Sequence, residues 1–225
     1  VTPGGLSNTS GIDDLLRTYV AKARTVADFN QLPIPYRAVA TDMVTGKMVV
    51  LDRGDLATAM RASMAIPGAF SPVVCDKFIL TDGGQVRNIP VDVARQTCAD
   101  VVIVVNLVEP ETPPEKLVQS TQLLARSMDV MLQANEDVQL ATLTERDVRI
   151  DVPMGDIGTA DFPRVPETIP LGETAARKVV EQLARYSVPP SDYMAWRQRV
   201  TVKQGVEARV AAVRFEGSNQ VNAEY

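Results

Sequence analysis

The apolar residues of this chain follow helical spacing in some stretches and form short strand-type runs in others. Over residues 11–26 they recur at steps of three and four, which predicts a helix that buries one face in an ordinary core. Two runs of strand-forming residues, 36–40 and 47–51, flank a turn at residues 45–46. This arrangement predicts a hairpin.

In the stretch from residue 61 to residue 90, turn and strand signals follow one another more closely than elsewhere in the chain. The sequence of this stretch is RASMAIPGAFSPVVCDKFILTDGGQVRNIP. A short helix capped by Asp55 is expected to break at Pro67, and a hairpin should follow. The second arm of this hairpin, residues 77–81, ends immediately before Asp82, which places a carboxylate at the end of a strand. In open α/β sheets, such strand ends border ligand crevices.

Two glycines follow the acid, and they allow two interpretations. Gly83 and Gly84 permit positive φ and a close backbone approach that a side chain would prevent. On the residues alone, an ordinary Asp-Gly-Gly turn that caps the next helix is the more common structure. The pattern around Asp82 therefore suggests a functional site but does not distinguish it from an ordinary turn.

The second half of the chain predicts a layered α/β fold. Residues 101–107 read VVIVVNL, an unalternated β-branched run that is typical of a parallel strand covered on both faces. A long helix should follow a proline-rich segment at 109–114, with its apolar stripe packed in the core. We expect a largely parallel β-sheet sandwiched by helices. The apolar stripe of the long helix consists of Leu117, Thr121, Leu124, Met128 and Met131. The remaining elements predicted here are a helix over 91–98, a strand over 148–152 and a helix over 172–186.

The end of the chain changes character. A polar helix with the single tryptophan, Trp196, follows two prolines at 189–190, and residues 208–216 alternate like a lone strand. We therefore predict a main domain over residues 1–187, a linker helix over 188–205 and the start of a small α+β module over 206–225.

Composition narrows the classes of function. With 225 residues and 45% hydrophobic content, the chain suits one large α/β domain with some residues left over. A net charge of −5 and no basic cluster argue against nucleic acid as a partner. Cys75 and Cys98 lack C-x-x-C spacing, so neither a zinc site nor a redox pair is indicated, and their pairing stays open. No apolar run is long enough to span a bilayer.

The chain contains no histidine. This absence removes the usual general base and the commonest metal ligand. Any acid-base chemistry contributed by this chain therefore falls to Asp, Glu, Lys or Tyr.

Several motifs in order resemble the second half of bacterial patatin-like phospholipases. They are LPIPYRAVATDMVTGKMVVLDRGDL, AMRASMAIPGAFSPV, LTDGGQVRNIPVDVAR and ADVVIVVNL, and together the resemblance covers about residues 6–186. The tail VAAVRFEGSNQV is more weakly similar to the first strand of the polypeptide-transport modules that precede outer-membrane barrels.

The resemblance implies a serine hydrolase that cleaves acyl esters of lipids with a Ser-Asp dyad and no histidine. Asp82 of the TDGG motif would be the dyad aspartate, and no cofactor or metal is implied. The substrate would be a phospholipid or another acyl ester, with contact to a membrane surface. A glycine-rich oxyanion loop and a G-x-S-x-G elbow should lie upstream.

These upstream motifs do not occur in the sequence. The nearest approach to an elbow is Gly5-Leu6-Ser7-Asn8-Thr9, which lacks the last glycine and has no strand before it. Ser63 and Ser71 also lack the strand-turn-helix context. We therefore expect the chain to be a fragment whose missing N-terminal segment supplies the nucleophile, and we expect the fragment alone to be inactive.

Other residues near the acid have a functional and a structural interpretation. Asp42 also ends a strand, although a structural turn is the preferred reading, and for Arg61 a salt bridge is preferred over contact with an anionic head group. Asn88 is expected to shape the loop that carries Asp82. Four residues are candidates for an acyl-binding wall, with plain core packing as the default: Met64, Ile66, Phe70 and Phe78.

Three functions from different classes stay open on the sequence. The favoured one is a lipid acyl hydrolase exported as the passenger of a type V secretion protein of a Gram-negative outer membrane, with a cytoplasmic location as the alternative and a homo-oligomer as an open question. The second is an inactive domain of the same fold that binds lipid or protein. The third is a nucleotide-binding α/β protein, which lacks any G-x-G-x-x-G or G-x-x-x-x-G-K-[ST] motif here.

Overall fold

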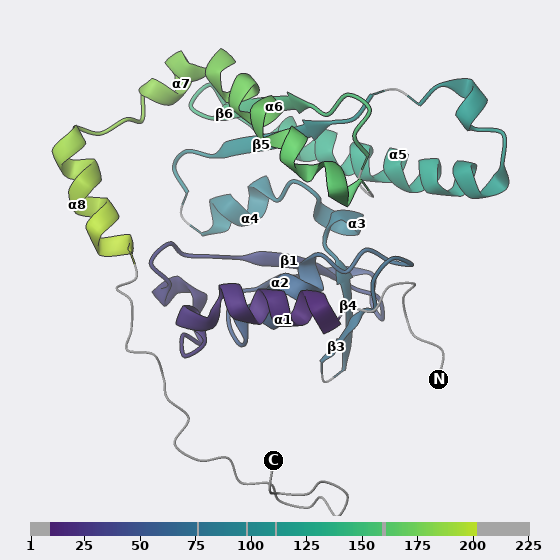
Figure 1. Ribbon diagram of the computed structural model, residues 1–225, viewed down its shortest axis with the longest axis horizontal. Coiled ribbons are helices and arrows are strands. Elements are labelled where there is room, and N and C mark those ends of the chain that lie inside the picture. Colours follow the sequence, from purple (N-terminus) through teal and green to yellow (C-terminus); the bar gives the residue numbers. More distant parts are fainter. Residues whose placement is uncertain (1–9, 76, 98, 111, 159–160, 202–225) are drawn as a thin grey trace, which may run out of the picture.

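Figure 1 shows a computed structural model of the chain with two sheets, one above the other, and two short helices between them. The structure describes residues 10–75, 77–97, 99–110, 112–158 and 161–201. The first sheet has four strands in the order β2-β1-β4-β3, and the second pairs β5 with β6. Residues 1–9 and 202–225 lie outside the described residues, and with them Ser7 and the predicted strand over 208–216.

The four-stranded sheet grows from the two predicted hairpins. Its strands are β1 (Ala38–Asp42), β2 (Lys47–Leu51), β3 (Val73–Cys75) and β4 (Phe78–Asp82), and every neighbouring pair is antiparallel. The first hairpin closes at Gly46, which has a φ of 67° that favours glycine. Cys75, at the end of β3, is an exposed free thiol, and Cys98 lies outside the described residues.

The helix α2 (Leu56–Ser63) packs on this sheet, and α1 (Ser10–Tyr19) packs on α2. The carboxylate of Asp55 accepts a hydrogen bond from the backbone N–H of Thr58, so the predicted cap of α2 is present. α1 ends at Tyr19, short of the expected residue 26, and Tyr19 and Leu15 are exposed. The expectation that this stripe is ordinary core was therefore wrong for its outer positions, because α2 covers only one side of α1.

The second sheet consists of β5 (Ile103–Val108) and β6 (Val148–Pro153), which run parallel as predicted. Alternate residues of β6 are buried against α6 (Val165–Lys178), and the other face of β5 packs near α4 (Val91–Gln96) and the end of α5 (Ser120–Leu140). The other helices are α3 (Gly84–Arg87), α7 (Val180–Ala184) and short 3-10 turns at Ala21–Ala23, Phe29–Gln31, Pro114–Lys116 and Phe162–Arg164.

The predicted α/β class, with a parallel pair of strands and flanking helices, is confirmed. In the described part of the chain, however, parallel pairing is confined to β5 and β6, and the other four strands are antiparallel. For β1–β2 and β3–β4 the difference arises because each pair is joined by a short turn, which permits only antiparallel pairing. Small buried clusters lie under each sheet, formed by Phe29, Ala38 and Ala59, by Ala40, Ala62 and Leu80, by Val91, Val102 and Val104, and by Val148, Ile150, Val152 and Ala175.

The expected core positions of α5 are largely exposed. Leu124 and Met131 expose 66% and 69% of their surface, and Figure 1 shows that the first half of α5 extends beyond the sheets. Core packing was therefore the wrong prediction for this stripe, because no described element lies against it.

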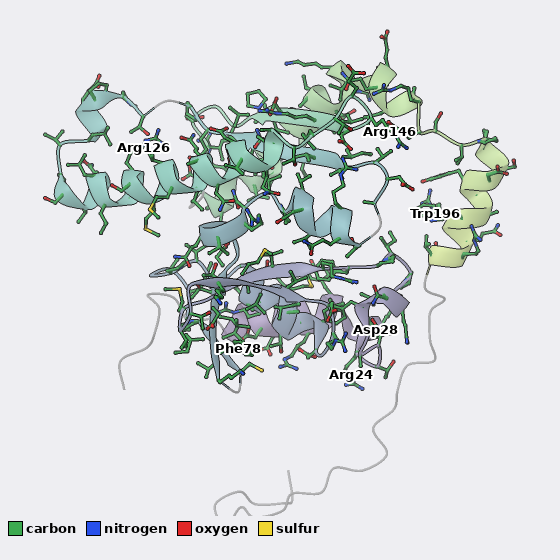
Figure 2. The ribbon with its side chains drawn as sticks, turned by 180° about the vertical axis from the view of Figure 1, so that it is seen from behind. Arg24, Asp28, Phe78, Arg126, Arg146 and Trp196 are labelled. Carbon is green, nitrogen blue, oxygen red and sulfur yellow. The ribbon has the colours of Figure 1, made fainter. Side chains whose placement is uncertain are left out.

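The helix α8 (Pro190–Val200) stands apart from both sheets. No residue of α8 is buried, and Figure 2 places Trp196 on it, well away from the labelled Phe78 of β4. A helix was predicted here as a linker; the domain boundary itself stays a prediction.

Candidate functional site

Asp82 is the last residue of β4 and is held by backbone contacts on two sides. It pairs with Ala40 of β1, and its N–H donates to the carbonyl oxygen of Ala65 at 3.0 Å. The Thr41 hydroxyl donates to the Asp82 carbonyl at 2.8 Å. The strand was expected to end one residue earlier. Because Asp82 belongs to the ladder, its main chain is fixed more firmly than that of a residue in a turn.

The carboxylate of Asp82 has one fixed oxygen and one available oxygen. Oδ1 accepts a hydrogen bond from the Gly84 N–H at 2.7 Å. Among the described residues no hydrogen bond to Oδ2 is found, so this oxygen can accept a proton from another group. Burial raises the pKa of Asp82, and the bond from Gly84 opposes part of this rise.

The two glycines after Asp82 are required by close contacts. A Cβ on Gly83 would lie 2.2 Å from the carbonyl oxygen of Val39, and a Cβ on Gly84 would lie 2.9 Å from Asn88 Oδ1 and 3.1 Å from Asp82 Oδ1. The φ of Gly83 is −69°, and Gly84 is not among the residues with positive φ. Close backbone approach, and not positive φ, is thus the property that these positions need.

Asn88 lies at the end of α3 and is exposed. Its side-chain amide donates to the carboxylate of Glu136 in α5, and the Asn135 amide of α5 donates to the Val86 carbonyl. Together these contacts hold α3 against α5. The side-chain oxygen of Asn88 lies close to Gly84, and the expected role of Asn88 in shaping the Asp82 loop stays a prediction.

The four candidates for an acyl-binding wall lie in two kinds of surroundings. Met64 and Ile66 flank Ala65, whose carbonyl bonds the Asp82 N–H, so their backbones lie beside the acid. Phe70 is buried beneath the guanidinium of Arg61, 5.7 Å from the ring centroid, and Phe78 packs against a buried cluster. Packing explains the two phenylalanines. The acyl-binding role of all four residues stays a prediction.

Of the two serines near this region, Ser63 forms a hydrogen bond through its hydroxyl and Ser71 through its backbone carbonyl. The Ser63 hydroxyl donates to the Val39 carbonyl at 2.7 Å, and the Ser71 carbonyl accepts from Arg61 Nη2 at 2.9 Å. Within the residues that the structure describes, neither hydroxyl is hydrogen-bonded to Asp82. The absence of a nucleophile from this part of the chain stays a prediction.

Asp42 and Arg61 have the structural roles that were preferred for them. The Asp42 carboxylate accepts from the Thr45 hydroxyl at 2.6 Å and the Val44 N–H at 3.1 Å, and the Thr45 bond lowers its pKa despite burial. Arg61 Nε lies 3.2 Å from Asp13 Oδ1. Across the described residues, no group of three or more acidic or cysteine side chains could hold a metal ion, and no helix is long and apolar enough to cross a membrane.

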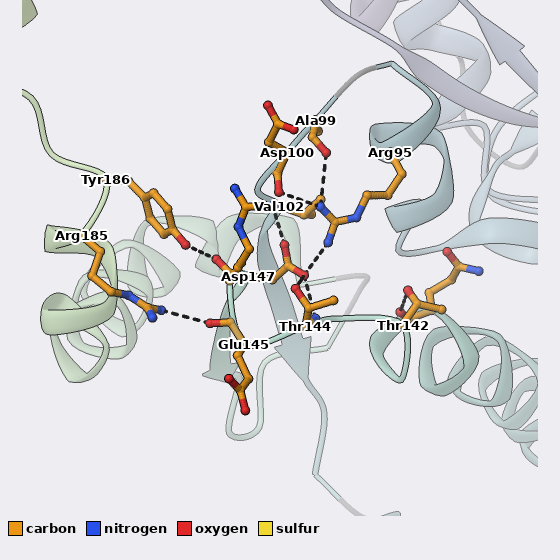
Figure 3. Close-up of polar contacts among 12 residues, drawn as sticks. Arg95, Ala99, Asp100, Val102, Thr142, Thr144, Glu145, Asp147, Arg185 and Tyr186 are labelled. Carbon is orange, nitrogen blue, oxygen red and sulfur yellow. Dashed lines mark hydrogen bonds and ion pairs between the residues drawn. The ribbon is translucent and has the colours of Figure 1, made fainter.

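One polar cluster was missed at the sequence level (Figure 3). Asp147, directly before β6, forms an ion pair with Arg95 of α4 and accepts from the N–H groups of Val102 and Thr144 at 2.8 and 2.7 Å. Burial alone would raise the pKa of Asp147, but these bonds and the nearby Arg95 lower it to about 2. The carboxylate is fully engaged, so the cluster joins the starts of β5 and β6 and has no free group for catalysis.

The first part of the chain is similar in sequence to a family of lipid hydrolases. Residues 1–95 match the family model of the patatin-like phospholipases, and this range includes Asp82. The uncharacterized NTE family protein Rv1063c of Mycobacterium tuberculosis is 38% identical over 116 residues, which are 52% of this chain and 31% of the relative. The NTE family protein Rv2565 of the same organism is 29% identical over 174 residues, or 67% of this chain and 29% of the relative.

An animal relative shares a shorter region. The mouse patatin-like phospholipase domain-containing protein 7 is 38% identical over 91 residues, which are 39% of this chain and 6% of the relative. The chain thus spans less than a third of each of these relatives. The likeness expected from the motifs is confirmed for the patatin-like region, and a secretion passenger finds no support in these comparisons.

Proposed function

We propose that this chain is part of a patatin-like lipid acyl ester hydrolase and supplies the acidic member of a Ser-Asp dyad, Asp82. The similarity of residues 1–95 to patatin-like phospholipases is the premise for the reaction class. The observation that supports the role of Asp82 is its geometry: Oδ1 is held by the Gly84 N–H, and Oδ2 has no hydrogen bond among the described residues.

In the proposed reaction, a serine from another part of the polypeptide attacks the ester carbonyl. Oδ2 of Asp82 accepts the serine proton as the new C–O bond forms, and the proton then passes to the departing alcohol. Water hydrolyses the acyl-serine by the same proton route. A raised pKa suits this task, because a carboxylate that binds a proton more tightly is a stronger base.

The test is a comparison of two strand-end aspartates in the whole polypeptide. Asp82→Asn should lower kcat for a phospholipid or a short acyl ester by about 10³–10⁴-fold, the size seen when a dyad or triad acid loses its charge. The control is Asp52→Asn; Asp52 directly follows β2 in the same sheet and forms an ion pair with its exposed neighbour Arg53. It should leave kcat within about twofold. Equal loss in both variants, or full activity of Asp82→Asn, would reject the role.

A fluorophosphonate probe tests where the nucleophile lies. The 225-residue chain should not react, whereas the whole polypeptide should be labelled at a serine outside these residues. Labelling of Ser7, Ser63 or Ser71 would contradict the proposal. If the whole polypeptide binds lipid vesicles but neither reacts with the probe nor hydrolyses esters, the inactive lipid-binding alternative is correct.

The location of the protein is a separate proposal that depends on sequence alone. The weak likeness of residues 206–225 to a polypeptide-transport module suggests a secretion passenger at a Gram-negative outer membrane. Fractionation of the producing cell, with detection of the protein in the cytoplasm only, would reject this location.

A further inference from the structure

The second half of α5 turns three polar side chains inward. Gln139 is buried, and Asn135 and Glu136 are partly buried on the same side of the helix. Two apolar residues of this segment, Met131 and Val138, instead expose 69% and 61% of their surface. A surface helix usually buries its apolar residues and exposes its polar ones. Because a buried polar group costs free energy unless it is hydrogen-bonded, this arrangement indicates specific contacts on the inner side of α5.

All three polar side chains bind the segment that follows the candidate site. The Asn135 amide donates to the Val86 carbonyl of α3, and the Glu136 carboxylate accepts from the Asn88 amide directly after α3. Gln139 Oε1 accepts from a backbone N–H in the first turn of α4 at 3.1 Å. These hydrogen bonds are directional, so they fix where the end of α3 lies and not only that it is packed.

The helix α3 depends on such support because it is a single turn of four residues. A helical turn this short is not stable by itself, so its neighbours determine its position. The start of α3 is held from the sheet, where the Thr81 hydroxyl donates to Gln85 Oε1 at 2.8 Å. Its far end is held by α5. The first residue of α3 is Gly84, whose N–H fixes Oδ1 of Asp82, so the contacts at both ends bear on this carboxylate.

The side chain of Asn135 also shows which of its atoms matters. Its Oδ1 is buried and has no hydrogen-bond partner among the described residues, whereas its amide nitrogen bonds the Val86 carbonyl. A buried acceptor without a partner destabilises the fold. Leucine, which has a similar shape, would avoid this cost but could not donate a hydrogen bond. The donor to Val86 is therefore the property that asparagine contributes at this position.

We propose that Asn135 and Glu136 are positioning residues, which hold α3 where its first N–H fixes one carboxylate oxygen of Asp82 and leaves the other oxygen available for the serine proton. Among the described residues neither side chain is hydrogen-bonded to Asp82, so both act through α3. The main chain of Asp82 is held separately, by β1 and the Ala65 carbonyl. Loss of the α5 contacts should therefore release the carboxylate without moving the strand. The catalytic consequence rests on the proposed function.

Residue-resolved amide hydrogen exchange of the whole polypeptide tests the positioning directly. In Asn135→Leu the Gly84 N–H should exchange at least about tenfold faster, while the Asp82 N–H should stay within about twofold of the wild type. Gln133→Leu, at an exposed position of the same helix, is the matched control and should change neither amide. An unchanged Gly84 amide would overturn the proposal. Equal acceleration of both amides would also overturn it, because that result would indicate a general loss of structure.

A pair of substitutions at Glu136 gives an independent readout. Glu136→Gln keeps an oxygen that can accept from the Asn88 amide, and kcat should stay within about threefold of the wild type. Glu136→Leu has no acceptor, so kcat should fall by about 10–100-fold while KM stays within about twofold, as expected when a reacting group is displaced. Active sites are counted with a fluorophosphonate probe, so that unfolded protein does not contribute. Equal kcat values in the two variants would overturn the proposal.

The exchange measurement does not depend on catalysis, so the two proposals can fail separately. A polypeptide whose Gly84 amide responds to Asn135→Leu but which does not hydrolyse esters would keep the positioning of Asp82 and reject the hydrolase. A hydrolase whose Gly84 amide and kcat do not respond to Asn135→Leu would do the reverse.

Discussion

A single carboxylate, Asp82, combines a cost to folding with a proposed catalytic role. Burial disfavours its charge, and one hydrogen bond from Gly84 compensates only in part. The neighbouring Gly83 allows the loop to lie against the Val39 carbonyl. We therefore expect a substitution that removes the charge of Asp82 to lower activity and to raise stability.

Asp82→Asn should increase the free energy of unfolding at pH 7 while it removes activity. The folded-state pKa of Asp82 lies above its unfolded value, so the wild-type residue loses stability as the pH rises from about 4 through the raised pKa. The amide is neutral and its oxygen can still accept from Gly84. Urea unfolding followed by circular dichroism should show a difference at pH 7 that disappears near pH 3. A less stable variant at pH 7 would show that the charge supports the fold.

The pH dependence of the whole polypeptide should reflect the same raised pKa. Below it Asp82 is protonated and cannot accept the serine proton, so kcat/KM should fall on the acid side with an inflection above the usual aspartate range. The measurement is kcat/KM from about pH 3 to about pH 9, which spans the ordinary aspartate value. An acid limb at or below about pH 3.9, the ordinary aspartate value, would argue against this base.

Gly83→Ala should destabilise the fold by about 1–3 kcal/mol because its Cβ would overlap a backbone oxygen, which cannot move like a side chain. Gly172→Ala is the matched control. A Cβ there meets nothing within 4 Å, and alanine favours helix, so α6 should gain about 0.5–1 kcal/mol. Thermal unfolding of the two variants measures both effects, and a stable Gly83→Ala variant would disprove the close contact.

At the scale of elements, local signals predicted far more than long-range contacts. β2 occupies the predicted residues, and α2 begins after the predicted Asp55 cap, because hairpin turns and helix caps are encoded by a few adjacent residues. The exposure of Leu124 and Met131 could not be predicted, since periodicity shows which face is apolar but not what covers it. The role of Asp82 came from motif resemblance and not from spacing.

The Arg95–Asp147 pair shows why the rest of the polar structure escaped prediction. The two residues lie on separate elements, far apart in the sequence, and neither stands in a recognisable motif. Only the folded arrangement brings α4 and the start of β6 together. A carboxylate that precedes a strand is too common a pattern to identify such a cluster.

Asp147→Asn should destabilise the chain by about 1–3 kcal/mol at pH 7, because bonds from Val102 and Thr144 lose their charged acceptor. The folded-state pKa is lowered to about 2, so this contribution is present above about pH 4 and is lost as the pH falls toward 2. Glu173→Gln, which removes an exposed ion pair with Arg177 on α6, should change stability by less than about 0.5 kcal/mol. Similar effects of the two substitutions would contradict the structural role of Asp147.

At the scale of the whole molecule, the last two helices differ in their contacts, and the predicted domain boundary can be tested between them. α7 packs on the second sheet, and beside it the Arg185 guanidinium and the Tyr186 hydroxyl donate to the carbonyls of Glu145 and Arg146. α8 has no buried residue. The predicted boundary near residue 187 lies between these two helices.

Removal of residues 188–225 should change the free energy of unfolding by less than about 0.5 kcal/mol, since no residue of α8 is buried. Removal from residue 179 onward should destabilise strongly, because Val179 and Leu183 pack against the cluster under β6. Urea unfolding followed by far-ultraviolet circular dichroism compares the two truncations. A large loss in the shorter truncation would place α8 inside the folded unit.

The separate position of α8 also determines what the tryptophan fluorescence of the protein can report. The chain has one tryptophan, Trp196, and its ring lies 5.7 Å between centroids from Tyr193 of the same helix. Its emission therefore reports on the surroundings of α8 and is expected to change little when the Asp82 sheet melts. An intrinsic-fluorescence melting curve of this protein would describe its outermost helix, and the stability of the candidate site must be followed by another probe.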